Sequence, residues 1–272
     1  MTFNIEIIAV GEEILKGRIV DTNSPWIVAQ ATSAGANITR ITCVGDNLSD
    51  IEAVIRDAIQ RGVDLVVTVG GLGPTPDDRT LEGIAKATGR QFRLDERILR
   101  ILERKYNEFA QQRGIKLTPE MLEGQRKMAF TAEGSEPIEN PLGTAPGIKL
   151  QVNKTMIISL PGVPAEMKAI FERSLLPLIR SKTKKCSLVK TVRVKMFESE
   201  LISVLQEVTK AYPQTYLKSY AVDPTAHRRE IGLKVDIIAE SETEEKCREI
   251  LEGAFQKLKA LVEERGSKIT LE

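Results

Sequence analysis

The sequence predicts an α/β protein: a parallel or mixed sheet covered by helices on both faces in three layers, followed by a small α+β unit. Strand and helix patterns alternate through the first half of the 272 residues, and the third strand pattern is continuously apolar. The composition changes near Ser181. We therefore expect one domain over residues 1–180 and a second over residues 181–272.

The chain opens with a short strand pattern and a helix pattern. Phe3–Val10 is mostly apolar, and Pro25 stands at the first position of a helix that runs through Thr32. Gly35 closes this helix, and Asn37–Val44 alternates as a second strand should.

The next three elements repeat this rhythm. Ser49 and Glu52 have the spacing of a capping box, which predicts a helix that ends before Gly62. Asp64–Val69 is continuously apolar, as expected for a strand buried on both faces. A glycine turn follows, and we expect the next helix over Asp78–Thr88.

The middle of the chain is less regular. Asp95 is expected to cap a helix that reaches Gly114, and Thr118 precedes a proline at the start of another. The sheet resumes after these helices, and the chain then turns into a helix ending near Ile179. The segments concerned are Ala145–Val152, Thr155–Leu160 and the turn Pro161–Pro164.

The second unit begins in a basic segment. Ser181–Lys195 carries six basic residues and no acid, which favours a solvated linker and an edge strand. Two strands between helices should complete this unit. We expect the strands near Thr215–Val222 and Arg229–Ala239, and the helices near Ser199–Ala211 and Glu242–Arg265.

Composition excludes several functional classes. A formal charge of +1 favours neither a nucleic-acid surface nor a membrane surface, and no stretch of about 18 apolar residues occurs. The amino terminus lacks a signal-peptide pattern and the three cysteines are far apart, so a cytoplasmic protein without disulfides is expected. His227 is the only histidine, which disfavours zinc and favours oxygen-ligated magnesium or manganese.

The glycine turn matches neither common nucleotide motif. There is no Gly-x-x-x-x-Gly-Lys-Ser/Thr phosphate loop, and Pro76 stands where a dinucleotide fingerprint would have its third glycine. In an open parallel sheet, however, ligands bind beyond the carboxyl ends of the strands. Each loop expected at that rim contains a carboxylate: Glu12, Glu13 and Asp21 after the first strand, Asp46 after the second, Asp77 and Asp78 after the third, and Glu166 after the last.

Each of these acids alone has an ordinary explanation. Asp77 or Asp78 fits a helix cap, and Glu166 suits the first turn of a helix. Together, like charges at one rim repel each other unless a cation joins them. A divalent ion with a phosphate in its shell removes the conflict, and the amides of Gly71–Gly73 then bind that phosphate.

Four segments together resemble the CinA family and the molybdopterin-binding fold of molybdenum-cofactor enzymes. They are GEEILKGRIVDTN (Gly11–Asn23), GGLGPTPDDRT (Gly70–Thr80), NPLGTAPG (Asn140–Gly147) and PGVPAEM (Pro161–Met167). Met196–Val208 is similar to the start of the KH-like domain of CinA proteins. The region lacks the Gly-x-x-Gly loop that clamps nucleic acid. Full-length bacterial members continue into a nicotinamide mononucleotide deamidase domain, which we expect this chain to lack.

The resemblance implies metal-dependent hydrolysis of ADP-ribose, or of a related dinucleotide such as FAD, at its pyrophosphate with release of AMP. Magnesium, manganese or cobalt would serve as the ion. The alternative is a non-catalytic protein that binds molybdopterin or a nucleotide and is related to molybdenum cofactor biosynthesis. A nucleic-acid accessory role is the weakest reading, and a homo-oligomer, with a dimer favoured, is expected.

The expected roles of individual residues follow from these motifs. The catalytic candidates are Asp78, Asp77, Glu12 and Glu166, with Asp78 first because the molybdopterin-binding enzymes keep an aspartate there. The metal candidates are Asp46, Asp77, Asp78 and Asp21. The expected substrate contacts are Gly70, Gly71, Leu72, Gly73, Thr75, Thr80, Asn23, Thr144 and Gly162.

Overall fold

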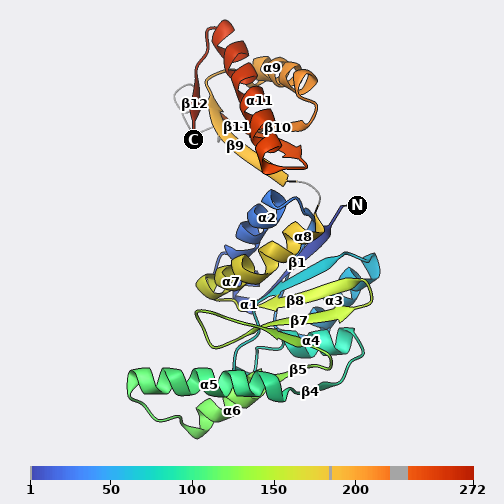
Figure 1. The fold of residues 1–272 in the computed structure, drawn as a ribbon, viewed down its shortest axis with the longest axis vertical. Helices are drawn as coiled ribbons and strands as arrows, with labels where there is room; N and C mark the ends of the chain where they lie inside the picture. Colours follow the sequence, from blue (N-terminus) through green and yellow to red (C-terminus); the bar gives the residue numbers. More distant parts are fainter. Residues whose placement is uncertain (1, 184–185, 221–231) are drawn as a thin grey trace. The chain divides into compact units, whose positions relative to one another are not determined.

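The computed structural model describes residues 2–183, 186–220 and 232–272, which form two compact units (Figure 1). The first unit contains residues 2–31 and 36–182, and the second contains residues 32–35 together with the described residues from 183 onward. The sequence analysis drew its boundary between residues 180 and 181. His227 lies outside the described residues.

A six-stranded mixed sheet forms the centre of the first unit. Its order is β2-β1-β3-β8-β7-β6, in which β2, β1, β3 and β8 are parallel, β7 is antiparallel to β8, and β6 is antiparallel to β7. This confirms the predicted fold class. The strands are β1 (Asn4–Val10), β2 (Asn37–Val44), β3 (Leu65–Val69), β6 (Glu136–Ile138), β7 (Gly147–Val152) and β8 (Thr155–Leu160).

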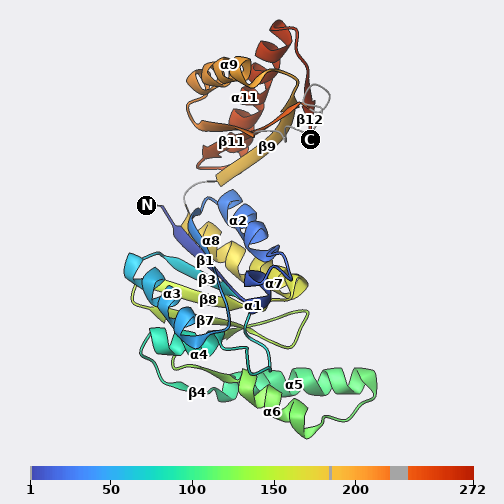
Figure 2. The ribbon, with the colours of Figure 1, turned by 180° about the vertical axis from the view of Figure 1, so that it is seen from behind.

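Helices cover both faces of this sheet. Figures 1 and 2 show α2, α7 and α8 on one face and α3 and α4 on the other. Apolar side chains of α3 and α4, such as Ile55 and Ile84, pack with Ile8 and Val66 of the sheet in one buried core. The helices are α1 (Glu12–Leu15), α2 (Asn23–Ser33), α3 (Leu48–Arg61), α4 (Thr80–Ala87), α7 (Pro164–Ile170) and α8 (Leu176–Lys182), with a π-helical turn, η1 (Phe171–Leu175), between the last two.

Three predicted helix starts are wrong. The helix α2 begins at Asn23, so Pro25 is its third residue and not its first. The helix α3 begins one residue before Ser49, and its cap is Asn47, whose side chain accepts the Ser49 N–H at 2.9 Å. Neither Asp77 nor Asp78 caps α4, because that helix begins at Thr80 and Arg79 occupies the cap position without a side-chain hydrogen bond. Both aspartates therefore lie in the turn before the helix.

An appendage of two helices and two short strands extends from the first unit. It contains β4 (Phe92–Leu94), α5 (Glu96–Arg113), α6 (Pro119–Met128) and β5 (Phe130–Ala132), and β4 pairs with β5. The predicted caps are confirmed: Asp95 accepts the N–H groups of Arg97 and Ile98, and Thr118 accepts that of Met121. The two short strands have three residues each, too few to show a periodicity, and were not predicted.

The described residues of the second unit form a four-stranded antiparallel sheet with two helices. The strand order is β10-β11-β9-β12, so β9 is an inner strand, and the predicted edge strand is wrong. The reason is β12, which pairs with β9 and was not predicted. The elements are β9 (Cys186–Val194), α9 (Glu198–Ala211), β10 (Thr215–Tyr220), β11 (Leu233–Ser241), α11 (Glu244–Glu264) and β12 (Ile269–Leu271).

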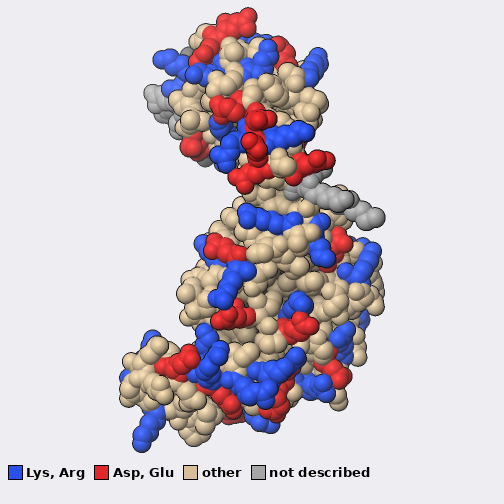
Figure 3. Space-filling view, viewed as in Figure 1, with Lys and Arg blue, Asp and Glu red and all other residues tan. Residues whose placement is uncertain are grey.

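Surface and membrane properties agree with the composition. On the face that Figure 3 shows, basic and acidic side chains are interspersed over both units. Among the described residues, no helix is both long enough and apolar enough to cross a bilayer.

Candidate functional site

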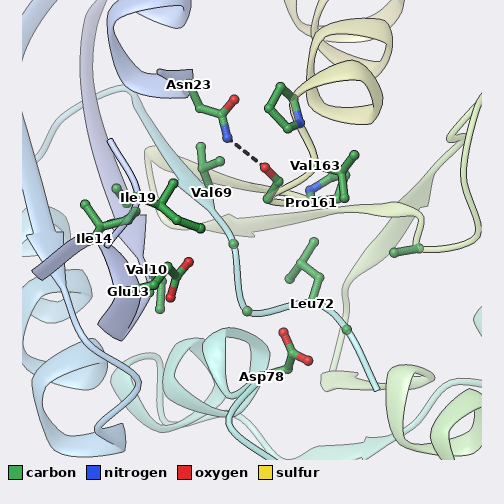
Figure 4. Close-up of a pocket in the computed structure, with 18 of the residues that line it drawn as sticks. Val10, Glu13, Ile14, Ile19, Asn23, Val69, Leu72, Asp78, Pro161 and Val163 are labelled. Carbon is green, nitrogen blue, oxygen red and sulfur yellow. Dashed lines mark hydrogen bonds between the residues drawn. The ribbon is translucent and has the colours of Figure 1, made fainter. Parts of the chain in front are cut away.

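A cavity of about 540 Å³ opens at the carboxyl ends of β1, β2, β3 and β8. From β1 the chain moves to β2 on one side and then to β3 on the other, so the cavity lies at a switch point of the strand order. Figure 4 shows side chains from the segments after β1, β3 and β8 around it, including Glu13, Asn23, Leu72, Asp78 and Val163. The site is therefore at the rim that the sequence analysis predicts.

The glycine turn after β3 is held on its α4 side by Thr80. The Thr80 hydroxyl donates to the carbonyl of Gly70 at 2.8 Å, and the Thr80 N–H donates to the carbonyl of Gly71 at 3.2 Å. Gly71 has a φ of +66°, and a Cβ added there would stand 2.2 Å from the Thr80 Oγ1. Only glycine fits this close approach in a left-handed conformation.

This anchoring orients the free amides of the turn. In a trans peptide the N–H of one residue points opposite to the preceding C=O, and no cis peptide occurs in the described residues. The N–H groups of Gly71 and Leu72 therefore point away from Thr80. Neither donates to an acceptor within the part of the chain that the structure describes, and both residues line the cavity. The turn thus offers two unpaired donors to an anion.

The carboxylates predicted to hold a metal line the same cavity, but three of the four accept main-chain N–H groups of other residues. These contacts fix the loops and leave each of the three carboxylates one oxygen free of them. Asp21 Oδ1 accepts the N–H groups of Asn23 and Ser24 at 3.0 Å, Asp46 Oδ2 accepts the Glu12 N–H at 3.2 Å, and Asp78 Oδ2 accepts the Thr75 N–H at 3.0 Å.

The acidic side chains influence one another. Burial raises the pKa of the Asp46 carboxyl; the Glu12 N–H lowers it, and the charges of Glu13, Asp77 and Glu12 raise it further. The pKa of Asp77 is lowered, first by the Thr75 hydroxyl and also by the Lys127 charge. Negative charge therefore accumulates on the Asp46 side of the cavity.

These acids do not form a ready metal centre. Among the described residues, no three His, Cys, Asp or Glu side chains come together in a group that could hold a metal ion. The predicted set of Asp21, Asp46, Asp77 and Asp78 shares one cavity without converging on one point. The donor set by itself does not fit a divalent ion, so we derive no chemical step through a metal.

The loop before β7 and the turn after β8 form the opposite wall. The Asn23 side-chain amide donates to the carbonyl of Gly162 at 2.9 Å (Figure 4). Buried Asn140 donates to Glu166 Oε2 at 2.6 Å and accepts the N–H groups of Leu142 and Gly143. This hydrogen-bonded loop places Thr144 in the lining and engages one oxygen of the Glu166 carboxylate.

Most of the predicted site residues line the cavity; two predicted contacts, Thr75 and Thr80, and one catalytic candidate, Glu12, do not. Asn23, Gly70–Gly73, Thr144 and Gly162 belong to the lining. Thr80 is fully buried behind the turn, Thr75 bonds Asp78, and Glu12 pairs with Lys16 at 3.1 Å; these three are not lining residues.

The sequence analysis also missed several lining residues. Glu13 takes the place expected of Glu12, and Met128 arrives from the appendage. The apolar residues Ile14, Ile19 and Val20 surround the mouth, and Ile19 and Val20 are largely exposed. An exposed isoleucine or valine carries no signal in a single sequence, because the same residue types fill the core.

Comparison with known proteins covers both units. Residues 6–181 match the family described as a probable molybdopterin-binding domain. A protein of Pyrobaculum arsenaticum is 38% identical, over 95% of this chain and 94% of its own length, and one of Aeropyrum pernix is 36% identical over 98% and 96%. The crystal structure of CinA of unknown function from Thermoplasma acidophilum is similar with a TM-score of 0.57 and 42% identity, and the match covers 65% of this chain and 98% of that one.

Proposed function

Because this chain belongs to the family of probable molybdopterin-binding domains, we propose that its rim cavity binds a molybdopterin-type or nucleotide ligand through a phosphate of that ligand. The relevant residues all lie in the part of the chain that matches the family. We therefore assign this role to the first unit.

The observation that carries the proposal is the pair of unpaired amides at Gly71 and Leu72. They belong to adjacent residues and line a cavity of about 540 Å³, a size typical of small-molecule sites. Adjacent main-chain donors in a glycine-rich turn bind phosphate oxygens in many folds. Main-chain N–H groups make this contact with the phosphate and no side chain is needed, which explains why glycines occupy the turn.

The mouth of the cavity suits the remainder of such a ligand. Ile14, Ile19 and Val163 present apolar surface there, and Figure 4 shows Ile19 and Val163 on opposite sides of the opening. Ile19 is 58% exposed and Val163 is 53% exposed, so a planar ring placed between them would cover both. A pterin or a purine is a ring of this kind.

A second candidate function is hydrolysis of a pyrophosphate ligand, and the carboxylates favour it. Burial raises the pKa of Asp46, and the charges of Glu13, Asp77 and Glu12 raise it further; a cation carried by the phosphates would relieve the repulsion among these charges. We propose magnesium, manganese or cobalt for this role, entering with the ligand rather than on a site built in advance. The product would be AMP from ADP-ribose or FAD.

One experiment tests both functions. Binding of AMP, ADP-ribose, FAD, freshly released molybdopterin and inorganic pyrophosphate to the full chain is measured by calorimetry, with chelator and with each of the three ions. The same mixtures are then chromatographed for AMP. Saturable binding in chelator without AMP supports the binding protein, and ion-dependent AMP release supports the hydrolase. The absence of saturable binding for every probe under every condition would contradict the proposal.

A further inference from the structure

The turn that offers the two amides has open space on both sides. A second cavity of about 420 Å³ lies beside the first, and Gly71, Leu72, Gly73 and Asp78 line both. Leu72 holds the middle of this segment in the hydrophobic core, and polar contacts fix its shape on either side. Thr80 anchors the first half of the segment, at Gly70 and Gly71.

Lys127 anchors the second half. Its ammonium Nζ donates to the carbonyl of Gly73 at 3.0 Å and to the carbonyl of Asp78 at 2.8 Å. These two carbonyls stand at the two ends of the segment Gly73–Asp78, so one cation ties the ends together. The Asp78 carboxylate closes the same segment from inside by accepting the Thr75 N–H.

The helix that carries Lys127 is fitted against this segment. Lys127 is in the last turn of α6, and a Cβ added at Gly124 on the same helix would stand 2.8 Å from the Cβ of Pro74. Burial lowers the pKa of the Lys127 ammonium, while the charges of Asp78 and Asp77 raise it. The carbonyls supply the hydrogen bonds that make a half-buried ammonium acceptable.

Lys127 is also placed to act on an anion without touching it. It lines the second cavity and not the first, so the glycine turn lies between its charge and the proposed ligand. The carbonyls of Gly70, Gly71 and Gly73 are all held by Thr80 or Lys127. The Thr80 contacts to Gly70 and Gly71 orient the N–H groups of Gly71 and Leu72, and Lys127 fixes the chain directly after them, at Gly73, where the next residue, Pro74, has no N–H.

We infer that Lys127 is the positioning residue of the phosphate site: it holds the Gly70–Asp78 turn in the form that presents the amides of Gly71 and Leu72. This inference rests on the proposed function, since it assigns the residue that maintains the same site. The ligand contact remains main-chain, and the cation acts through the turn.

The test compares three variants of the full chain. Lys127→Met keeps the length of the side chain and removes donors and charge, whereas Lys127→Arg keeps both. Arg126→Met is the matched control. Arg126 is the residue before Lys127, and its side chain makes no hydrogen bond or ion pair in the described part of the chain. The affinity for inorganic pyrophosphate is measured by calorimetry, and folding is checked by thermal unfolding.

We expect Lys127→Met to weaken binding about tenfold or more, since two charge-assisted hydrogen bonds are lost. Lys127→Arg should stay within about threefold of the parent chain, and Arg126→Met should be unchanged, because neither removes a donor from the turn. Parent-like affinity of a folded Lys127→Met variant would overturn the inference, as would an equal loss in Arg126→Met.

A second readout separates this inference from the proposed function. In the ligand-free chain the Thr80 N–H donates to Gly71 and the Thr75 N–H donates to Asp78, so both report on the turn. Hydrogen exchange at these two amides should be faster in Lys127→Met, with exchange in β1 unchanged. If the parent chain binds no probe, the proposed function fails on its own. Unaltered exchange at Thr75 and Thr80 would refute the positioning role in either case.

Discussion

The Asp78 carboxylate accepts the Thr75 main-chain N–H at 3.0 Å and also the Thr75 hydroxyl. This contact lies ahead of α4, and it makes Asp78 a structural member of the turn as well as a charge at the cavity. An aspartate next to a phosphate site therefore has a reason to be there that does not require a metal. The two roles can be separated by substitution.

Asp78→Asn separates them because the amide keeps an acceptor oxygen and loses the charge. If the cavity binds a phosphate without an ion, removing the like charge should raise affinity for pyrophosphate in chelator about two- to tenfold. Asp78→Ala should lower that affinity, since the turn loses its acceptor. Calorimetry on both variants checks this expectation. If metal-dependent AMP release operates instead, Asp78→Asn should abolish it, which is the opposite outcome.

Gly71→Ala should lower the free energy of unfolding by far more than the left-handed φ angle alone explains. Gly71 and Gly89 have φ values of +66° and +65°, but a Cβ at Gly71 meets Thr80 whereas one at Gly89 meets no atom within 4 Å. We expect Gly89→Ala to lower the free energy of unfolding by about 1 kcal/mol, and Gly71→Ala by about 2 kcal/mol or more, with loss of binding. Urea unfolding of the two variants is the measurement, and equal losses would show that crowding at Thr80 is unimportant.

Asn140→Ala should loosen the wall that carries Thr144. The Asn140 side chain is buried and satisfies two main-chain N–H groups, one carbonyl and Glu166. Leaving such groups unpaired should cost about 2–3 kcal/mol of unfolding free energy. Glu166→Gln is the control, because a glutamine oxygen still accepts from Asn140, and its change should stay within about 0.5 kcal/mol. Comparable destabilisation by Asn140→Ala and Glu166→Gln would show that the charge of Glu166, and not the hydrogen bonds of Asn140, accounts for the loss of stability.

Asp95 gives a pH-dependent prediction away from the cavity. Its carboxylate caps α5 and accepts from the Arg97 guanidinium at 2.7 Å, and this contact holds the pKa of Asp95 below its ordinary value. A lowered folded-state pKa gives stability that is complete above the unfolded pKa and lost as the pH falls through the folded value. Asp95→Asn keeps the cap, so its deficit in melting temperature at pH 7 should shrink below about pH 4. A deficit in melting temperature that stays constant down to pH 2 would show that the charge of the Asp95 carboxylate does not stabilise the fold.

The sequence predicts the parallel core because its elements are locally encoded. The continuous apolar run at Leu65–Val69 and the left-handed glycine at Gly62 need no partner to be recognised. The errors occur where the partner is distant or where two residues compete for one role. Asn47 and Ser49 are both good caps, and the backbone selects the first. The inner position of β9 depends on β12, more than 70 residues later.

The same limit applies to the cavity. The glycines and acidic residues that follow the strands predict a site at the carboxyl end of the sheet, and Gly70–Gly73 and Asp46 do line the cavity there. Nothing near Lys127 in the sequence connects it with Gly73, because the two are 54 positions apart and meet only when the appendage folds back. The expected homo-oligomer and the cytoplasmic location stay predictions.

The order of strands also determines when the cavity can exist. Pairing of β1 with β2 and β3 joins residues nearer in the chain, such as Asn4 with Asn37 and Ile5 with Leu65, whereas β8 joins β3 only after an intervening stretch of more than 80 residues has been arranged. Closing a long loop is slow relative to forming local contacts. On the ribosome, three of the four loops around the cavity are synthesised before the chain reaches the Gly162 carbonyl that Asn23 binds. A nascent chain therefore completes this cavity late, when the wall formed by the residues after β8 has been synthesised.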